Sequence, residues 1–271
     1  MTTAPFISRI ERLASVPSTN DVVAGWLDAG VGEVCVASAD VQTAGRGRMG
    51  RTWVAPPGAA LLVSAGFRPS WTGPERAWRI AATVSLAMAD AAEDVAGLPG
   101  RAVLLKWPND LVIADAPDAG GAVRKLGGVL GEATGVGTPD PRVVVGIGMN
   151  AGWRADDFPP DLATSMTSLT VASGGRPVDA VALLAAFLDR LEPRIEALRA
   201  GRFDVADWTA RQLTRRTHVR LVRGTDPEDA EDVVAIGVDP LTGALVVEDP
   251  GVEGGERQVH AGEITRLLAR V

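Results

Sequence analysis

Two lysines are the residues of this sequence most selectively placed for chemistry. The 271-residue chain has 27 Lys and Arg residues, and only Lys106 and Lys125 are lysine. Arginine serves well in solvated ion pairs, but it cannot replace a compact ammonium with rotatable donors at a tight polar site. We therefore expect both lysines to lie where a small cation is needed.

A glycine-arginine segment provides the second candidate for anion binding. Residues 45–51 read Gly-Arg-Gly-Arg-Met-Gly-Arg. Glycine lets the backbone approach a ligand closely, while Arg46, Arg48 and Arg51 can converge on it. Such a loop suits a phosphate or a carboxylate, and it can close over its ligand. On this segment alone, a solvated loop or a short RNA-contacting tract explains the pattern equally well.

A polar turn follows the predicted strand that carries Lys106. Asn109 and Asp110 could hold a magnesium ion or orient a triphosphate, because Mg²⁺ keeps water ligands and takes only one or two carboxylates. A β-turn stabilised by these two side chains is an equally good explanation. The turn therefore becomes a candidate site only in combination with other segments.

Glycines on two predicted strands leave backbone surface bare. Gly127 and Gly128 follow Lys125, and Gly146 and Gly148 face one side of their own strand. Glycine inside a strand is costly unless something packs into the space. An extended ligand ending at the Lys125 ammonium would fill it, and close packing of a helix on the sheet is the alternative.

Composition excludes several functional classes. A net charge of −7 and an excess of acidic residues argue against general nucleic-acid binding. The single cysteine, Cys35, cannot form an internal disulfide, which fits a reducing cytoplasm. The first residues carry no export signal, and the apolar runs are too short to span a bilayer. We find no P-loop, no dinucleotide fingerprint, no nucleophile triad and no zinc spacing. His218 and His260 are isolated.

These segments need a scaffold of strands and helices. Apolar runs predict strands at 32–40, 60–67, 102–107, 110–115, 125–134 and 142–150, which favours a mostly antiparallel sheet. Helices are expected at 19–30, 75–96 and 178–213, the last with a break near Pro193 or Ala200-Gly201. From residue 217 short strands and a hairpin turn at 239–243 predict a small, separate β-barrel.

Five motifs in order resemble biotin protein ligases. They are Pro17-Ser18-Thr19-Asn20, residues 42–51 (Gln-Thr-Ala-Gly-Arg-Gly-Arg-Met-Gly-Arg) with Trp53, Lys106-Trp107-Pro108-Asn109-Asp110, Lys125-Leu126-Gly127-Gly128 and Gly146-Ile147-Gly148-Met149-Asn150. The resemblance extends from about Ile10 through the C-terminal region, which is matched by pattern more than by motif. Both lysines fall inside motifs.

The resemblance implies an α+β fold. A class II aminoacyl-tRNA synthetase-like catalytic domain would span residues 1–215, and a small SH3-like domain residues 216–271. The implied enzyme converts biotin and Mg·ATP to biotinyl-5′-AMP and transfers biotin to a lysine of the biotin carboxyl carrier domain of acyl-CoA carboxylases. It implies a cytoplasmic monomer or weak homodimer that binds no nucleic acid and no membrane. Because the Ser-Thr-Asn motif begins at residue 18, we expect no N-terminal DNA-binding domain.

The resemblance also assigns roles to residues. Lys125, Arg48 and Arg46 would be catalytic, bringing the biotin carboxylate and the α-phosphate together. The biotin site would comprise Ser18, Thr19, Asn20, Gln42, Gly45, Arg46, Gly47, Arg48, Lys125, Gly128 and Gly146. The ATP site would comprise Arg48, Arg51, Trp53, Lys106, Asn109, Asp110 and Asn150, with Asp110 as a magnesium ligand.

Three other hypotheses remain at this stage. A lipoate or octanoate ligase on the same fold would carry a different glycine-rich segment with a nearby histidine, which is absent here. A nucleic-acid-contacting module built on the Arg-Gly loop conflicts with the acidic charge. A protein that binds biotin without catalysis would not need both lysines and Asn109-Asp110.

Overall fold

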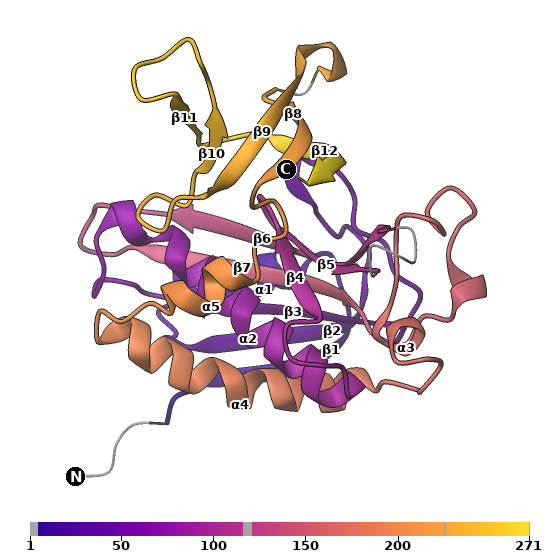
Figure 1. The fold of residues 1–271 in the computed structure, drawn as a ribbon. Coiled ribbons are helices and arrows are strands. Elements are labelled where there is room, and N and C mark those ends of the chain that lie inside the picture. The colour runs from indigo at the N-terminus through magenta and orange to yellow at the C-terminus, as the bar shows by residue number, and fades with distance from the viewer. Residues whose placement is uncertain (1–4, 116–120, 225, 271) are drawn as a thin grey trace.

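The computed structural model describes residues 5–115, 121–224 and 226–270, which form two sheets with helices packed on the larger one (Figure 1). The larger sheet has the strand order β1-β2-β3-β7-β6-β5-β4. Its strands are β1 (Arg9–Val16), β2 (Cys35–Gln42), β3 (Ala60–Phe67), β4 (Val103–Lys106), β5 (Asp110–Ala114), β6 (Val123–Thr134) and β7 (Arg142–Asn150). Only β1 and β2 pair in parallel, so the predicted mainly antiparallel sheet is confirmed.

Helices cover both faces of the larger sheet. Alternate residues of β2 face opposite ways, so Cys35 packs against α1 (Thr19–Asp28) while Val36 joins the main core. That core lies under α2 (Trp78–Ala96) and α4 (Ala180–Arg199). No helix among the described residues is long and apolar enough to cross a membrane.

The smaller elements complete the chain. Its short helices are α3 (Leu169–Ala172), α5 (Val205–Ala210) and the 3₁₀ turns Arg48–Gly50, Pro74–Arg76, Ala155–Asp157 and Pro227–Asp229. The second sheet has the order β11-β10-β9-β8-β12. Its strands are β8 (Thr217–Val222), β9 (Ala230–Val238), β10 (Leu245–Glu248), β11 (Glu256–Val259) and β12 (Glu263–Arg270).

The second sheet packs against the first and shares its hydrophobic core. The main core continues from α2 and β6 into Val219 and Leu221 of β8. The β9–β10 hairpin also reaches α2, because Trp78 donates its Nε1 hydrogen to the Leu241 carbonyl oxygen at 3.2 Å. In Figure 1 this sheet, in orange and yellow, lies at the top of the view, beside β5 and β6.

Two helix expectations need refinement. The break predicted in residues 178–213 falls at Ala200-Gly201, where Gly201 has a φ of 76°, and α4 continues through Pro193. Buried Leu191 and Ile195 on either side hold that turn against the core despite the lost backbone donor. The predicted helix at 75–96 begins as a 3₁₀ turn and becomes α-helical at Trp78.

Candidate active site

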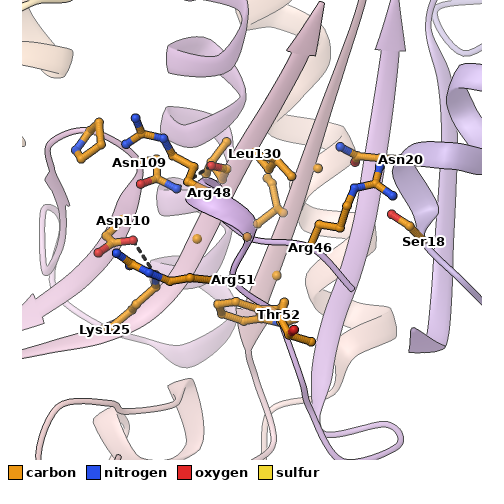
Figure 2. A pocket seen from close by; sticks show the side chains of 18 of the residues that line it. Ser18, Asn20, Arg46, Arg48, Arg51, Thr52, Asn109, Asp110, Lys125 and Leu130 are labelled. Carbon is orange, nitrogen blue, oxygen red and sulfur yellow. Dashed lines mark hydrogen bonds and ion pairs between the residues drawn. The ribbon is translucent and has the colours of Figure 1, made fainter. Parts of the chain in front are cut away.

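Most of the predicted site residues converge on one cavity of about 120 Å³. It lies between the start of α1, the loop after β2, the β4–β5 turn, strands β6 and β7, and the start of β12 (Figure 2). The predicted residues that line it are Ser18, Thr19, Asn20, Gln42, Arg46, Gly47, Arg48, Arg51, Trp53, Lys106, Asn109, Asp110, Lys125, Gly128 and Gly146. Gly45 and Asn150 are not among them.

One wall is a row of hydrogen-bonded side chains at the start of α1. Gln42 Oε1 accepts from the Thr19 amide at 2.7 Å and from Thr19 Oγ1 at 2.9 Å. Buried Ser64 lies 2.7 Å from Thr19 Oγ1 and 2.6 Å from Asn20 Oδ1. A serine hydroxyl has a single hydrogen, so these two acceptors compete for one donor. The row therefore has acceptor capacity left for the N–H groups of a ligand.

The opposite wall is cationic around one carboxylate. Asp110 places Oδ1 2.6 Å from Lys125 Nζ and Oδ2 3.7 Å from Lys106 Nζ. Figure 2 shows Asp110 and Lys125 side by side. Burial lowers the pKa of Lys106, because desolvation disfavours its charged form more than Asp110 supports it. Asn109 is fixed by donating its Nδ2 hydrogen to the Val129 carbonyl oxygen at 2.8 Å.

The glycine-arginine loop folds back on itself across the cavity. Gly47 donates its amide hydrogen to the Arg51 carbonyl oxygen at 2.7 Å, and Trp53 donates to Gly45 at 2.9 Å. Gly45 has to be glycine, because a Cβ there would collide with the Trp53 carbonyl oxygen. Met49 occupies the left-handed region with a φ of 56°, which makes the tight bend.

The loop is bound to the second sheet through two of its arginines. Arg48 Nη1 donates to the Gly262 carbonyl oxygen at 3.3 Å, and Arg51 Nη1 donates to Glu263 Oε1 at 2.8 Å. The Arg51 guanidinium lowers the pKa of the Glu263 carboxyl, while burial lowers the pKa of Arg48. The two arginines predicted to contact nucleotide are therefore held by β12 and the residue before it.

Arg46 points to the other end of the cavity. It donates to both carboxylate oxygens of Asp21, at 2.7 and 2.9 Å, and its Nη2 lies 3.2 Å from both oxygens of Glu132. Hydrogen bonding from Arg46 lowers the pKa of Asp21. Figure 2 shows Arg46 beside Asn20, across the cavity from Asp110.

The bare backbone predicted at the glycines is covered by two side chains. Trp53 lies against Gly148 and Gly128, and Asn20 lies against Gly146, so a Cβ at Gly146 or Gly148 would collide with them. Trp53 Nε1 is buried without a hydrogen-bond partner among the described residues, while its ring centroid is 5.7 Å from Lys125 Nζ. The glycines therefore make room for an indole as well as for a ligand.

Asn150 does not line this cavity, and its assignment to the ATP side stays a prediction. Because side chains alternate along β7, Asn150 lies on the same face as Gly146 and Gly148, two residues beyond Gly148 at the end of the strand. There it is fully buried and donates its Nδ2 hydrogen to the Thr167 carbonyl oxygen at 3.0 Å, while Oδ1 has no hydrogen-bond partner in the part of the chain that the structure describes. The segment carrying Thr167 covers it.

That segment and two further side chains contact predicted site residues and were not predicted from the sequence. Lys125 pairs its backbone with residues 165–167, donating to Ser165 at 2.8 Å and accepting from Thr167 at 2.9 Å. Ser64 contacts a predicted site residue from the middle of β3, and Glu132 does so from near the end of β6. Their only signal was a polar side chain within a largely apolar strand.

No group of three or more His, Cys, Asp or Glu side chains able to hold a metal occurs within the described residues. Asp110 fits a magnesium ion as one carboxylate ligand, since Mg²⁺ is commonly completed by water and substrate phosphates. Both of its oxygens face ammonium groups, so binding a metal would require an exchange of partners.

Comparison with known sequences identifies the family. The chain matches the Biotin/lipoate A/B protein ligase family over residues 13–150. It is 33% identical over 267 residues to a biotin–acetyl-CoA-carboxylase ligase of Mycobacterium tuberculosis, covering 96% of this chain and 89% of that protein. The chain belongs to the biotin/lipoate A/B protein ligase family, as its five motifs predicted.

Solved structures agree with the fold. A biotin protein ligase from Aquifex aeolicus, in complex with biotin and ATP, superposes with a TM-score of 0.74 at 24% identity, covering 96% of this chain and 99% of that one. A biotin protein ligase from Leishmania major, in complex with biotinyl-5-AMP, gives a TM-score of 0.59 at 25% identity, covering 93% and 99%. The predicted α+β fold is confirmed at this level.

Proposed function

We propose that this chain is an ATP-dependent biotin–protein ligase that acts on the carboxyl carrier domain of biotin-dependent carboxylases. The observation that carries the proposal is one cavity with an acceptor-rich polar row and Arg46 at one end and four further cationic side chains around the rest. Those four cations are Arg48, Arg51, Lys106 and Lys125. A ureido ring offers N–H donors to the row, and two anions can meet among the cations.

The first step joins the two anions. A carboxylate oxygen of biotin forms a bond to the α-phosphorus of ATP, the bond to the bridging oxygen breaks, and pyrophosphate leaves. Lys125 and Arg48 lower the repulsion between the reacting groups and stabilise the charge that develops. Lys106 and Asn109 hold the phosphates, and a magnesium ion bound with Asp110 would neutralise phosphate charge.

The second step transfers the acyl group. The lysine amine of the carrier domain attacks the acyl carbon of biotinyl-5′-AMP, AMP leaves with the electrons of the broken C–O bond, and the amine proton passes to solvent. No covalent enzyme intermediate is needed. A mixed anhydride hydrolyses readily, so the loop that carries Arg48 must exclude water until the acceptor arrives.

The finer fold and partner assignments belong to the same proposal. We place a class II aminoacyl-tRNA synthetase-like catalytic domain at residues 1–215 and an SH3-like domain at 216–271, a division supported by the change of sheet before Thr217. We retain a monomer or weak homodimer in the cytoplasm, where Cys35 would stay reduced.

The proposal is tested with purified protein, biotin, Mg·ATP and an isolated carrier domain. We expect pyrophosphate and biotinyl-5′-AMP, followed by a mass gain of one biotin on the carrier. Lipoate or octanoate replaces biotin in a parallel reaction. Activation of those acids and not of biotin would assign the chain to the other branch of its family.

A further inference from the structure

Glu132 contacts two proposed biotin-site residues although it does not line their cavity. Its Oε2 accepts from Asn20 Nδ2 at 2.7 Å, and both of its oxygens lie 3.2 Å from Arg46 Nη2. Gly128, Leu130 and Glu132 share one face of β6, so Glu132 follows the strand outward from the cavity. It lies in the wall of a neighbouring cavity, which also includes Arg48, Lys106, Asn109 and Asp110. It reaches the first cavity through its hydrogen bonds to Asn20 and Arg46.

The contact with Asn20 decides which way the amide faces. Asn20 is 4% exposed and lies between Glu132 and Ser64. The Ser64 hydroxyl can donate or accept, so it accommodates either end of an amide. A carboxylate can only accept, so it requires the NH₂ end and repels the oxygen. Glu132 therefore makes Asn20 present its oxygen to Ser64 and to the polar row.

The contact with Arg46 ties the loop to the same carboxylate. Asp21 also binds Arg46, through both of its oxygens, but Asp21 has no hydrogen bond to Asn20 among the described residues. Glu132 thus performs two tasks and Asp21 one. The pair provides a matched comparison, because both are acidic partners of one guanidinium.

We propose that Glu132 is a positioning residue for biotin, fixing the amide of Asn20 and restraining Arg46. The inference rests on the proposed function, because it assigns Glu132 to the ureido end of that site. It concerns binding of the ground state, so loss of Glu132 raises KM for biotin and leaves kcat nearly unchanged. The KM for ATP stays within about twofold, because in the part of the chain that the structure describes Glu132 pairs with Asn20 and Arg46, while Lys106 and Lys125 pair with Asp110.

The first test compares three variants in the pyrophosphate-release assay, with calorimetric biotin binding alongside. Glu132→Ala should raise KM and Kd for biotin about tenfold, the usual effect of losing a hydrogen bond to a charged group. Glu132→Gln keeps an acceptor for Asn20 and should lose less. Asp21→Asn, which leaves Asn20 untouched, should change KM for biotin by about threefold or less.

The second test exchanges the donor and the acceptor. Asn20→Asp alone places two carboxylates in contact and should lose biotin affinity. Adding Glu132→Gln restores a donor facing an acceptor, so the double variant should bind biotin better than Asn20→Asp alone. The melting temperatures of Asn20→Asp and of the double variant are compared as a control. If Glu132 had only a structural role, the double variant would not regain biotin affinity when these two temperatures are equal.

The outcomes separate this inference from the proposed function. If the unchanged chain forms no biotinyl-5′-AMP, the proposed function fails and the inference fails with it. If the unchanged chain is active but Glu132→Ala keeps KM for biotin within about twofold, or the double variant gives no rescue, only the inference is overturned.

Discussion

At the scale of single residues, the cavity is defined by two polar groups that are each shared between two partners. One Ser64 hydrogen serves both Thr19 and Asn20, and one Asp110 carboxylate faces both lysines of the chain. A ligand with N–H donors can hydrogen-bond to the acceptor that the Ser64 hydrogen leaves unpaired. A ligand with anionic oxygens competes with Asp110 for the two lysines. Both conditions describe biotin meeting a nucleotide phosphate.

Ser64→Ala tests the polar row. Removing the shared hydrogen leaves buried Asn20 Oδ1 dependent on the ligand alone and disturbs the row, so biotin affinity should fall about fivefold to tenfold. Calorimetry measures the effect. Ser38→Ala is the matched control, because Ser38 is a buried strand serine whose hydroxyl has no hydrogen-bond partner within the described ranges. Equal losses in the two variants would contradict the role of the row.

Lys125 tests the need for an ammonium. Lys125→Ala should lower the rate of adenylate formation about 10² to 10³-fold, as removal of a preorganised donor to developing charge does. Lys125→Arg should recover little, because a planar guanidinium cannot take the place of a compact ammonium beside Asp110. Pyrophosphate release reports both. Arg124→Ala, which removes a neighbouring cation paired with Asp115, should retain activity; full activity of Lys125→Arg would refute the argument.

At the scale of elements, the glycine-arginine loop is attached to the start of β12 by hydrogen bonds from its arginines. Arg48 and Arg51 come from the loop, while Glu263 begins the last strand and Gly262 directly precedes it. A nucleotide that recruits these arginines has to compete with those contacts. Closure of the loop over the adenylate and its attachment to the second sheet therefore use the same side chains.

Arg48→Gly tests water and acceptor exclusion by the loop. Without the Arg48 side chain, the loop should close less well over biotinyl-5′-AMP, so activated biotin should escape and label unrelated amines. Incubation with an unrelated lysine-rich protein and detection of attached biotin measures the leak. Unchanged acceptor selectivity together with unchanged adenylate retention would contradict it.

Glu263 makes the loop attachment sensitive to pH. Because Arg51 lowers its pKa in the folded protein, the Glu263 carboxylate stabilises the fold above its ordinary pKa of 4.5. This stabilisation is lost as the pH falls through the lowered value. Glu263→Gln should therefore melt earlier than the unchanged chain at pH 7, and the gap should close at acidic pH. Glu256→Gln is the control, because Glu256 is an exposed residue of β11. A difference in melting temperature that grows on acidification would contradict the prediction.

Strong local patterns were predictable from the sequence and weak ones were not. The buried apolar run of β3 and the apolar face of α2 are local patterns that predict a strand and a helix directly. The five motifs contain most of the residues that line the cavity. Strand β1 was not predicted because it is an edge strand with exposed Arg9 and Arg12, and β12 was not predicted because it follows β11 closely. Ser64 and Glu132 acquire their roles only through contacts distant in sequence.

At the scale of the whole molecule, one continuous core joins both sheets. Cys35 lies in the layer between α1 and β2 and reports on the integrity of that layer. Burial raises the pKa of its thiol to about 11, from an ordinary value of 9.0. Folding therefore favours the neutral thiol, and this contribution to stability is lost as the pH rises from 9.0 through about 11.

The single thiol gives a clean folding assay. At pH 8 the native chain should react with a thiol reagent at least about 100-fold more slowly than the chain in denaturant, because burial and the raised pKa both suppress the thiolate. Absorbance of the released product gives the rate. Saturating biotin and ATP should slow the reaction further if they stabilise the fold. Rapid labelling of the native chain would contradict a buried Cys35.

The central claim is that one cavity joins biotin to ATP and passes the product to a carrier lysine. The most direct measurement is mass spectrometry of an isolated carboxyl carrier domain after incubation with this protein, biotin and Mg·ATP. The account predicts a mass gain of one biotin, dependent on ATP and abolished by Lys125→Ala. A carrier domain that stays unmodified, with no pyrophosphate released, would contradict it.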